Sequence, residues 1–97
     1  MLNSRQRAQL RGMANGYDTI LHIGKGGITD TVIRQADEAL TARELIKVCV
    51  LETGGITPRQ AADIIAEKTA SDVVQVIGSK FILYRENKDD KKILLVK

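Results

Sequence analysis

The sequence predicts a single α/β domain with the element order α-β-α-β-α-β-β, in which helices pack on a four-stranded mixed sheet. Two observations predict this class. Apolar residues recur at helical spacing in three segments, and short, nearly continuous apolar runs lie between and after these segments. Such runs are typical of strands that are covered on both faces. Because 97 residues suffice for one core without disulfides or metals, we expect one domain over residues 1–97.

Three helices are predicted over about residues 4–15, 30–41 and from Pro58 onward. The first and third begin with the spacing of a capping box, in which a short polar side chain and a glutamine three residues later bond each other's backbone amides. These pairs are Asn3 with Gln6 and Thr57 with Gln60. Pro58 suits the first helical position, because its missing N–H has no partner there in any case.

Four strands are predicted at residues 20–23, 45–51, 73–77 and 81–84. The last two are joined by Gly78 and Ser79, which suit a hairpin loop because glycine accepts a positive φ. Since strand–helix–strand crossovers are right-handed, we expect a largely parallel sheet that ends in one antiparallel hairpin strand. Two crossover helices should cover one face, and the first helix part of the other.

The end of the chain, residues 86–97, is predicted to be a charged tail. We expect a solvated loop over residues 86–92 and an edge strand at residues 93–96.

The net charge of +3 lies entirely in the first quarter of the chain. Residues 1–27 contain four basic side chains against Asp18 alone, whereas the remaining charges cancel. The basic residues are Arg5, Arg7, Arg11 and Lys25. A localised positive patch attracts polyanions. The alternative is a solvated basic helix face without a partner.

A glycine-rich loop, Gly24-Lys25-Gly26-Gly27, lies between a predicted strand and a predicted helix. Glycines let a ligand backbone approach closely, the following helix N-terminus favours an anion, and a lysine supplies a mobile positive charge. The pattern G-x-x-x-x-G-K-[ST] of triphosphate-binding loops is absent, and Thr29 stands where a dinucleotide-binding loop needs its third glycine. The G-x-x-G clamp of KH-type nucleic-acid modules fits. An ordinary strand–helix turn remains the alternative.

Other reactive side chains predict neither catalysis nor metal binding. His22 has no cluster of ligands at metal spacing, and it is expected to pack at a strand or loop edge. Cys49 lies within an apolar strand and is expected to be a buried, inert thiol. The chain has three aromatic residues, too few for a platform of stacked bases. We expect no cofactor and no enzymatic activity.

Location is predicted from three further features. The first 15 residues have no apolar leader, no apolar segment is long enough to span a membrane, and there is a single cysteine. These features predict a cytoplasmic protein. Separately, we expect the chain to be a monomer.

Several segments, taken together, resemble the signature of CRM domains of the YhbY-like type. They are RQRAQLR (residues 5–11), LHIGKGGIT (residues 21–29), ELIKV (residues 44–48), VQVIG (residues 74–78) and LYR (residues 83–85). The likeness runs nearly end to end, and a single domain of this kind resembles the stand-alone prokaryotic members rather than the plant proteins that carry several such domains. Beyond Arg85 no residue pattern is carried over.

This resemblance implies an RNA-binding protein. Stand-alone members of the family associate with precursors of the large ribosomal subunit, and plant relatives act in group II intron splicing. The fold implied is similar to the C-terminal domain of a translation initiation factor. Carried over to this chain, the RNA-binding residues are Gly24, Lys25, Gly26 and Gly27 with Arg5, Arg7 and Arg11. Ribosomal RNA is the expected partner, with ribosomal proteins second.

Two rival interpretations remain. A protein–protein adaptor that docks on ribosomal proteins would make the basic patch incidental. An enzyme that acts on a nucleotide or phosphorylated small molecule could use the glycine loop, although no catalytic base or metal motif accompanies it.

Overall fold

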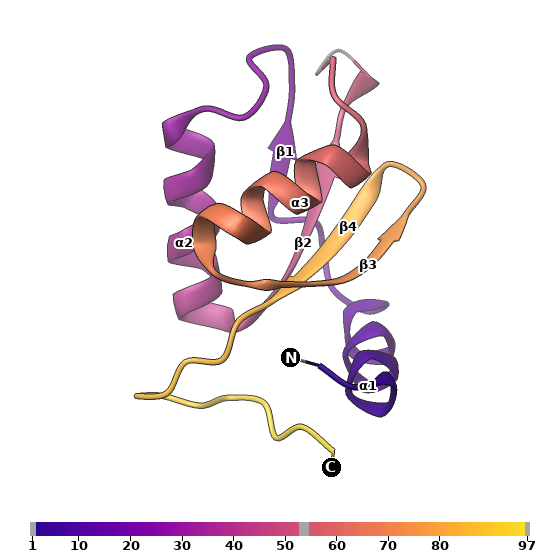
Figure 1. Ribbon diagram of the computed structural model, residues 1–97, viewed down its shortest axis with the longest axis vertical. Coiled ribbons are helices and arrows are strands. Elements are labelled where there is room, and N and C mark those ends of the chain that lie inside the picture. The colour runs from indigo at the N-terminus through magenta and orange to yellow at the C-terminus, as the bar shows by residue number, and fades with distance from the viewer. Residues whose placement is uncertain (1, 53–54, 97) are drawn as a thin grey trace.

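The computed structural model describes residues 2–52 and 55–96, and it has the predicted order of helices and strands (Figure 1). The elements are α1 (Ser4–Ala14), β1 (Leu21–Ile23), α2 (Asp30–Arg43), β2 (Leu45–Val50), α3 (Pro58–Thr69), β3 (Asp72–Ile77) and β4 (Lys80–Tyr84). Part of the predicted turn between β2 and α3, at Gly54, lies outside the described residues.

Both predicted capping boxes are present. In α1, Asn3 Oδ1 accepts from the Gln6 amide at 2.8 Å, and Gln6 Oε1 accepts from the Asn3 amide at 3.1 Å. The same exchange joins Thr57 and Gln60 at the start of α3, at 3.1 Å in each direction. Each cap gives partners to amides that a helix start leaves unpaired, which fixes where these helices begin.

The sheet is mixed, as predicted, but the position of the last strand differs from the prediction. The strand order is β1-β2-β4-β3, so β4 lies between β2 and β3 instead of at the end of the sheet. β1 and β2 are parallel, whereas β4 is antiparallel to both of its neighbours, so two of the three strand pairs are antiparallel and the expectation of a largely parallel sheet is wrong. The hairpin turn has the expected glycine geometry, with φ of 57° at Gly78. A hairpin strand can pair on either side, and the strand pattern alone does not decide which.

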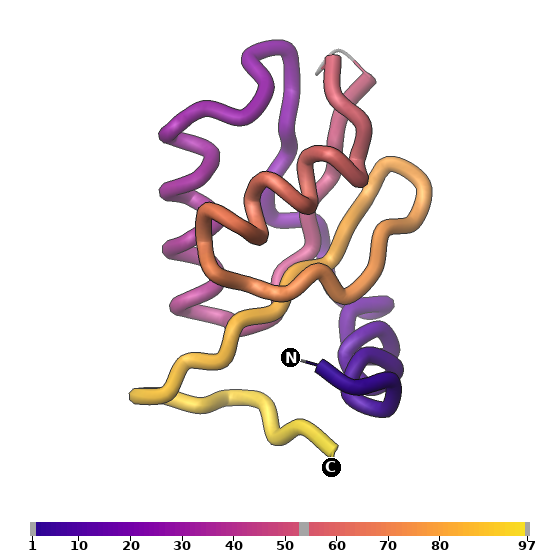
Figure 2. Tube along the Cα trace, in the orientation of Figure 1, coloured from indigo at the N-terminus to yellow at the C-terminus, as the bar shows by residue number. Residues whose placement is uncertain are grey.

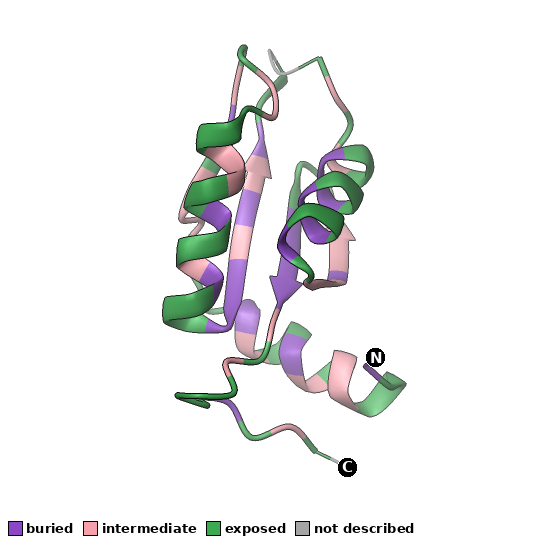
Figure 3. Ribbon diagram, turned by 60° about the vertical axis from the view of Figure 1, so that its left-hand side comes forward, coloured by how far each residue is buried: buried purple, intermediate pink, exposed green. Residues whose placement is uncertain are grey.

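Two cores lie on opposite faces of the sheet, and the predicted placement of the helices is confirmed. α2 and α3 cover one face, where Ile46, Val48, Phe81 and Leu83 point toward them. α1 packs on the other face. The residues of this second core are Leu2, Leu10, Ala14, Leu45, Val74, Ile82, Tyr84 and Ile93. Figure 3 shows α1 at one end of the molecule, apart from α2 and α3.

The second face is only half covered, because α1 packs on the sheet at the start of β2 and the end of β4. Side chains that share this face farther along the strands are half-buried or exposed. We call them the open sheet face: His22, Cys49, Gln75, Ile77 and Lys80. The expectations that His22 packs and that Cys49 is buried are therefore wrong. Both side chains point to the part of this face that α1 leaves uncovered.

The tail forms no edge strand, which corrects the prediction for residues 93–96. Instead it runs back beside α1 (Figure 2). Gln6 Nε2 donates to the Val96 carbonyl at 3.0 Å, while Gln9 donates to the Leu94 carbonyl at 2.8 Å and accepts from the Val96 amide at 2.8 Å. Two glutamine side chains thus replace the strand partner that this segment lacks, and Ile93 is buried.

Among the described residues, no helix is both long and apolar enough to cross a membrane.

Candidate nucleic-acid interface

The glycine loop is a tight turn that closes on itself. The Gly27 amide donates to the Gly24 carbonyl at 2.9 Å, which fixes the loop as a four-residue turn directly after β1. Gly27 has a φ of 68°, a left-handed conformation that side chains with a Cβ adopt only at a cost. A Cβ at this position would meet no atom within 4 Å. The need for glycine therefore comes from the backbone angle and from access to the loop, not from crowding inside the protein.

The tip of the loop presents free donors. In the described part of the chain, the amides of Lys25 and Gly26 make no hydrogen bond, and both residues are exposed. The start of α2 is less available, because Thr29 Oγ1 already accepts from the Val32 amide at 3.2 Å. Asp30 also places a negative charge in the first turn of α2. An anion would therefore be held by the turn and Lys25 rather than by the helix terminus.

A cavity of about 500 Å³ opens near the loop, between the β2–α3 connection and the β3–β4 turn. Leu51 connects the two features, since its Cδ1 would lie 3.6 Å from a Cβ at Gly24. Apolar side chains line much of the cavity, and Glu52 also lines it. A carboxylate repels phosphate, so this cavity is not the predicted anion site.

The predicted arginines lie at the other end of the molecule. Figure 1 shows α1 at the end opposite the loop between β1 and α2, so the basic first quarter of the sequence does not form one cluster. Arg5 and Arg11 are exposed. Arg7 is half-buried, and its Nη1 donates to the Val73 carbonyl of β3 at 2.6 Å. Arg7 therefore anchors α1 to the sheet, whereas Arg5 and Arg11 are available to a ligand.

Lysines of β2 and β4 were missed among the predicted site residues. Lys80 is exposed on the open sheet face, and Lys47 shares that face one strand away. Lys47 Nζ donates to the Ala14 carbonyl at 3.2 Å, so it caps the end of α1. Because side chains alternate along a strand and Val48 faces α2 and α3, Lys47 must face the other side of the sheet. This signal was available in the sequence, but β2 and β4 are so apolar overall that both of their faces look buried.

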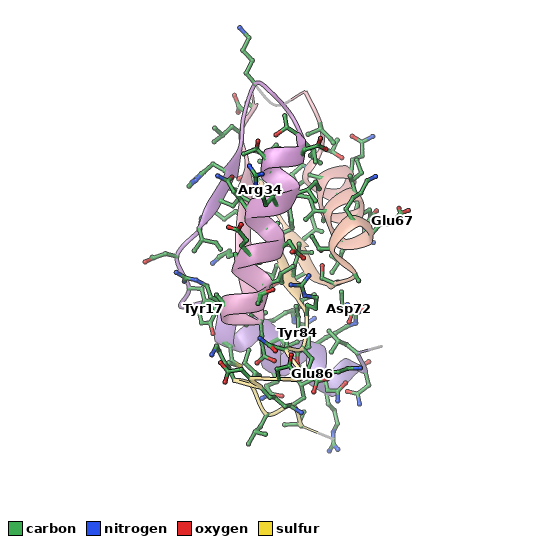
Figure 4. All side chains as sticks on the ribbon, turned by 90° about the vertical axis from the view of Figure 1, so that its left-hand side faces the viewer. Tyr17, Arg34, Glu67, Asp72, Tyr84 and Glu86 are labelled. Atoms are coloured by element: carbon green, nitrogen blue, oxygen red, sulfur yellow. The ribbon has the colours of Figure 1, made fainter. Side chains whose placement is uncertain are left out.

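Aromatic side chains form no platform for stacked bases. Phe81 and Tyr84 are buried, and Tyr17 is the one exposed aromatic residue. The Tyr84 side chain lies near Asp72 and Glu86 at the α1 end of the molecule (Figure 4). Burial, together with the charges of Glu44, Glu86 and Asp72, raises the pKa of Tyr84 to about 12. Any nucleic acid would therefore be held by backbone contacts rather than by stacked bases.

A buried carboxylate fixes the end of the domain opposite the glycine loop. Glu44 ends α2 with a φ of 64° and is fully buried. Its Oε1 accepts from the amides of Lys92 and Ile93 at 2.6 and 2.7 Å, and its Oε2 accepts from the Asn87 amide at 2.7 Å. Burial by itself would raise the pKa of Glu44, but these three amides and the charge of Lys91 bring it below its ordinary value.

Arg85 joins three elements near Glu44. Its Nη1 donates to Asp37 Oδ1 at 2.6 Å and to the Thr69 carbonyl at 2.8 Å. Its Nη2 donates to the Asp37 carbonyl at 2.9 Å and to Thr41 Oγ1 at 2.8 Å. The guanidinium thus ties the ends of α2 and α3 to β4, which makes Arg85 a structural residue.

Within residues 2–52 and 55–96, no three His, Cys, Asp or Glu side chains lie close enough to hold a metal ion.

Comparison with known proteins identifies related chains along nearly the whole sequence. The model of the CRS1/YhbY (CRM) domain matches residues 2–85. A Bacillus subtilis relative, "Probable RNA-binding protein YqeI", is 41% identical over 98% of this chain and 99% of its own length. A Haemophilus influenzae "RNA-binding protein" is 31% identical over 93% of this chain and 91% of its own. The protein SAV1595 from Staphylococcus aureus, whose solution structure is known, has 45% sequence identity to this chain. The two structures superpose with a TM-score of 0.82 over 99% of this chain and 100% of SAV1595.

Proposed function

This chain belongs to the CRS1/YhbY (CRM) domain family, and we propose that it binds RNA through the turn at Gly24–Gly27. The loop contacts phosphates with the amides of Lys25 and Gly26, and the Lys25 ammonium adds a positive charge. Two relatives with "RNA-binding" in their names support the ligand class. The observation that carries the proposal is the turn itself, whose exposed tip presents unpaired amides beside a lysine.

The RNA is a structured segment of large-subunit ribosomal RNA in a precursor particle. The resemblance to stand-alone CRM proteins supports this target, and the chemistry of the site is compatible with it. Contacts to phosphate position a protein without reading bases, and the scarcity of exposed aromatics leaves little base recognition. Selectivity should therefore come from the shape of the RNA. The protein assists assembly by binding, without catalysis.

The test compares Gly27→Asp with Gly27→Asn in binding to large-subunit ribosomal RNA fragments at several salt concentrations. The two side chains have nearly the same size, and both tolerate a positive φ better than most residues. They therefore share the conformational cost and differ mainly in charge. We expect Gly27→Asp to lose roughly tenfold in affinity, about 1.4 kcal/mol, relative to Gly27→Asn at low salt.

Thermal unfolding of both variants shows that each remains folded. Equal affinities of wild type and both variants would contradict the loop as the RNA contact. If even the wild type fails to bind RNA but retains a protein partner after nuclease treatment, the adaptor interpretation replaces the present one.

A further inference from the structure

The uncovered half of the sheet is a second surface that the glycine loop does not account for. His22, Ile77 and Lys80 are exposed on it, and Ile77 exposes 59% of its surface. Cys49 and Gln75 are half-buried between them. Neither α1 nor the tail, as far as the structure describes the chain, packs on these residues. A sheet face left open in this way is available to a ligand.

The charges on the two sides of the protein differ in sign. Among the residues defined as the open sheet face, Lys80 carries the one formal charge, and Lys47 lies next to it on the same side of the sheet, where it contacts the end of α1. The helical layer on the opposite side, α2 and α3, carries five acidic and four basic residues. A polyanion that approaches the domain is therefore attracted to the open sheet face and not to the helical layer.

The open sheet face also connects the two separated parts of the predicted site. His22 lies on β1 two residues before Gly24, so one border of the face adjoins the glycine loop. At the other border, Arg7 of α1 contacts β3, and Arg11 follows one helical turn later. Gln6 and Gln9, on a different side of α1, hold the tail. The side of the helix that carries Arg7 and Arg11 is thus the one that adjoins the sheet.

We infer that one RNA strand crosses the open sheet face, from the glycine loop past Lys80 to Arg11. This inference rests on the proposed function and extends it by a binding surface. The occupant is a sugar–phosphate backbone, because the charged side chains are cationic and the face carries no aromatic residue for stacking. Ile77 and Gln75 lie against the sugars. β2, with six residues, is about 17 Å long, which is enough for several phosphates.

The first experiment compares Lys80→Glu with Lys68→Glu in the full chain. Both lysines are exposed and the charge change is the same, but Lys68 lies on α3 in the helical layer. We expect Lys80→Glu to weaken binding to a large-subunit ribosomal RNA fragment about tenfold at low salt, with a shallower salt dependence. Lys68→Glu should change the affinity less than about twofold. Equal effects of the two variants would overturn the inference.

The second experiment uses Cys49, the single cysteine of the chain, as a reporter within this face. RNA bound across the sheet should slow alkylation of the Cys49 thiol by iodoacetamide several-fold. With Gly27→Asp at the same RNA concentration, the rate should return toward that of the free protein. An unchanged rate in wild type at saturating RNA would overturn the inference.

The outcomes separate the two proposals. If Gly27→Asp loses affinity while Lys80→Glu does not and Cys49 is not protected, the loop contacts RNA and the open sheet face does not. If Lys80→Glu alone loses affinity and Cys49 is protected, the face is the RNA contact and the loop is not. If wild type binds no RNA, both fail.

Discussion

The two ends of this domain treat their backbone polar groups in opposite ways. At the α1 end, buried Glu44 accepts three amides, Arg85 donates four hydrogen bonds, and two glutamines bond the tail. At the loop end, the amides of Lys25 and Gly26 have no partner in the described chain. A buried polar group without a partner is costly, whereas an exposed one is free to bind a ligand. If the loop binds RNA as proposed, stability depends mainly on one end and RNA contact on the other, so variants at the two ends should have separable effects.

The largest expected effect is at Glu44. Glu44→Gln keeps an acceptor for Lys92 and Ile93 but turns an amide N–H₂ toward the Asn87 N–H, so one partly buried backbone amide loses its partner. We expect a loss of about 3 kcal/mol in the free energy of unfolding at pH 7, measured by urea denaturation. RNA affinity at low temperature should remain within about twofold, since the loop lies at the other end. Glu67→Gln, at an exposed position on α3, is the control and should change little.

The same carboxylate predicts a pH dependence. Because folding lowers the pKa of Glu44, its contribution to stability is fully present above the ordinary value of 4.5. That contribution is lost as the pH falls through the lowered pKa of the folded state. The stability difference between wild type and Glu44→Gln should therefore shrink from pH 7 to pH 3. A difference that stays constant over this range would show that the Glu44 charge does not stabilise the tail.

A smaller effect is expected at Arg85, whose side chain is 21% exposed. Arg85→Met keeps much of the side-chain volume but removes the bonds to Asp37, Thr41 and the Thr69 carbonyl. We expect a loss of about 2 kcal/mol in thermal or urea unfolding. Arg85→Lys should recover less than half of this loss, because an ammonium cannot reproduce the planar fork.

Arg59→Met is the matched control for Arg85. Arg59 forms an exposed pair with Asp63 at 3.4 Å, and such pairs contribute little to stability. Comparable losses at the two arginines would show that the Arg85 network is not a major source of stability.

The smallest expected effect is at Lys25. Lys25→Ala should reduce RNA affinity about threefold near physiological salt and lower the slope of log affinity against log salt by about 1. The free energy of unfolding should change by less than about 0.5 kcal/mol, because Lys25 is exposed and belongs to no ion pair in the described structure. An unchanged slope would mean that the lysine does not contact phosphate.

Local signals in the sequence predicted the elements well. Capping boxes at Asn3 and Thr57 placed the starts of α1 and α3, and the glycines at 24, 26 and 27 placed the loop after β1. Each of these features is decided within a few residues, by backbone amides that need partners or by a φ that needs glycine. Such local requirements can be read without knowledge of the tertiary structure.

Nonlocal features could not be predicted in the same way. The pairing of Leu45 with Tyr84 places β4 in the middle of the sheet, and nothing in either strand's own sequence requires it. Cys49 looks buried in an apolar strand because the sequence does not reveal that α1 covers only half of that face. The tail was mistaken for a strand because its partners, Gln6 and Gln9, are side chains distant in sequence. For the same reason, closeness of Arg11 and Lys25 in the sequence gave no guide to their separation in space.

The central position of β4 also constrains how the domain can form during synthesis. β1, β2 and β3 all emerge before the strand that joins β2 to β3. Until β4 is available, the β2 edge that pairs with it is unsatisfied, and Phe81 and Leu83 are missing from the core against α2 and α3. We expect the nascent chain to remain largely unfolded until residue 84 has left the ribosome, and then to fold cooperatively, with the slow kinetics typical of long-range strand pairing. The order of strands thus predicts a domain that folds late and as a whole, rather than stepwise from its N-terminus.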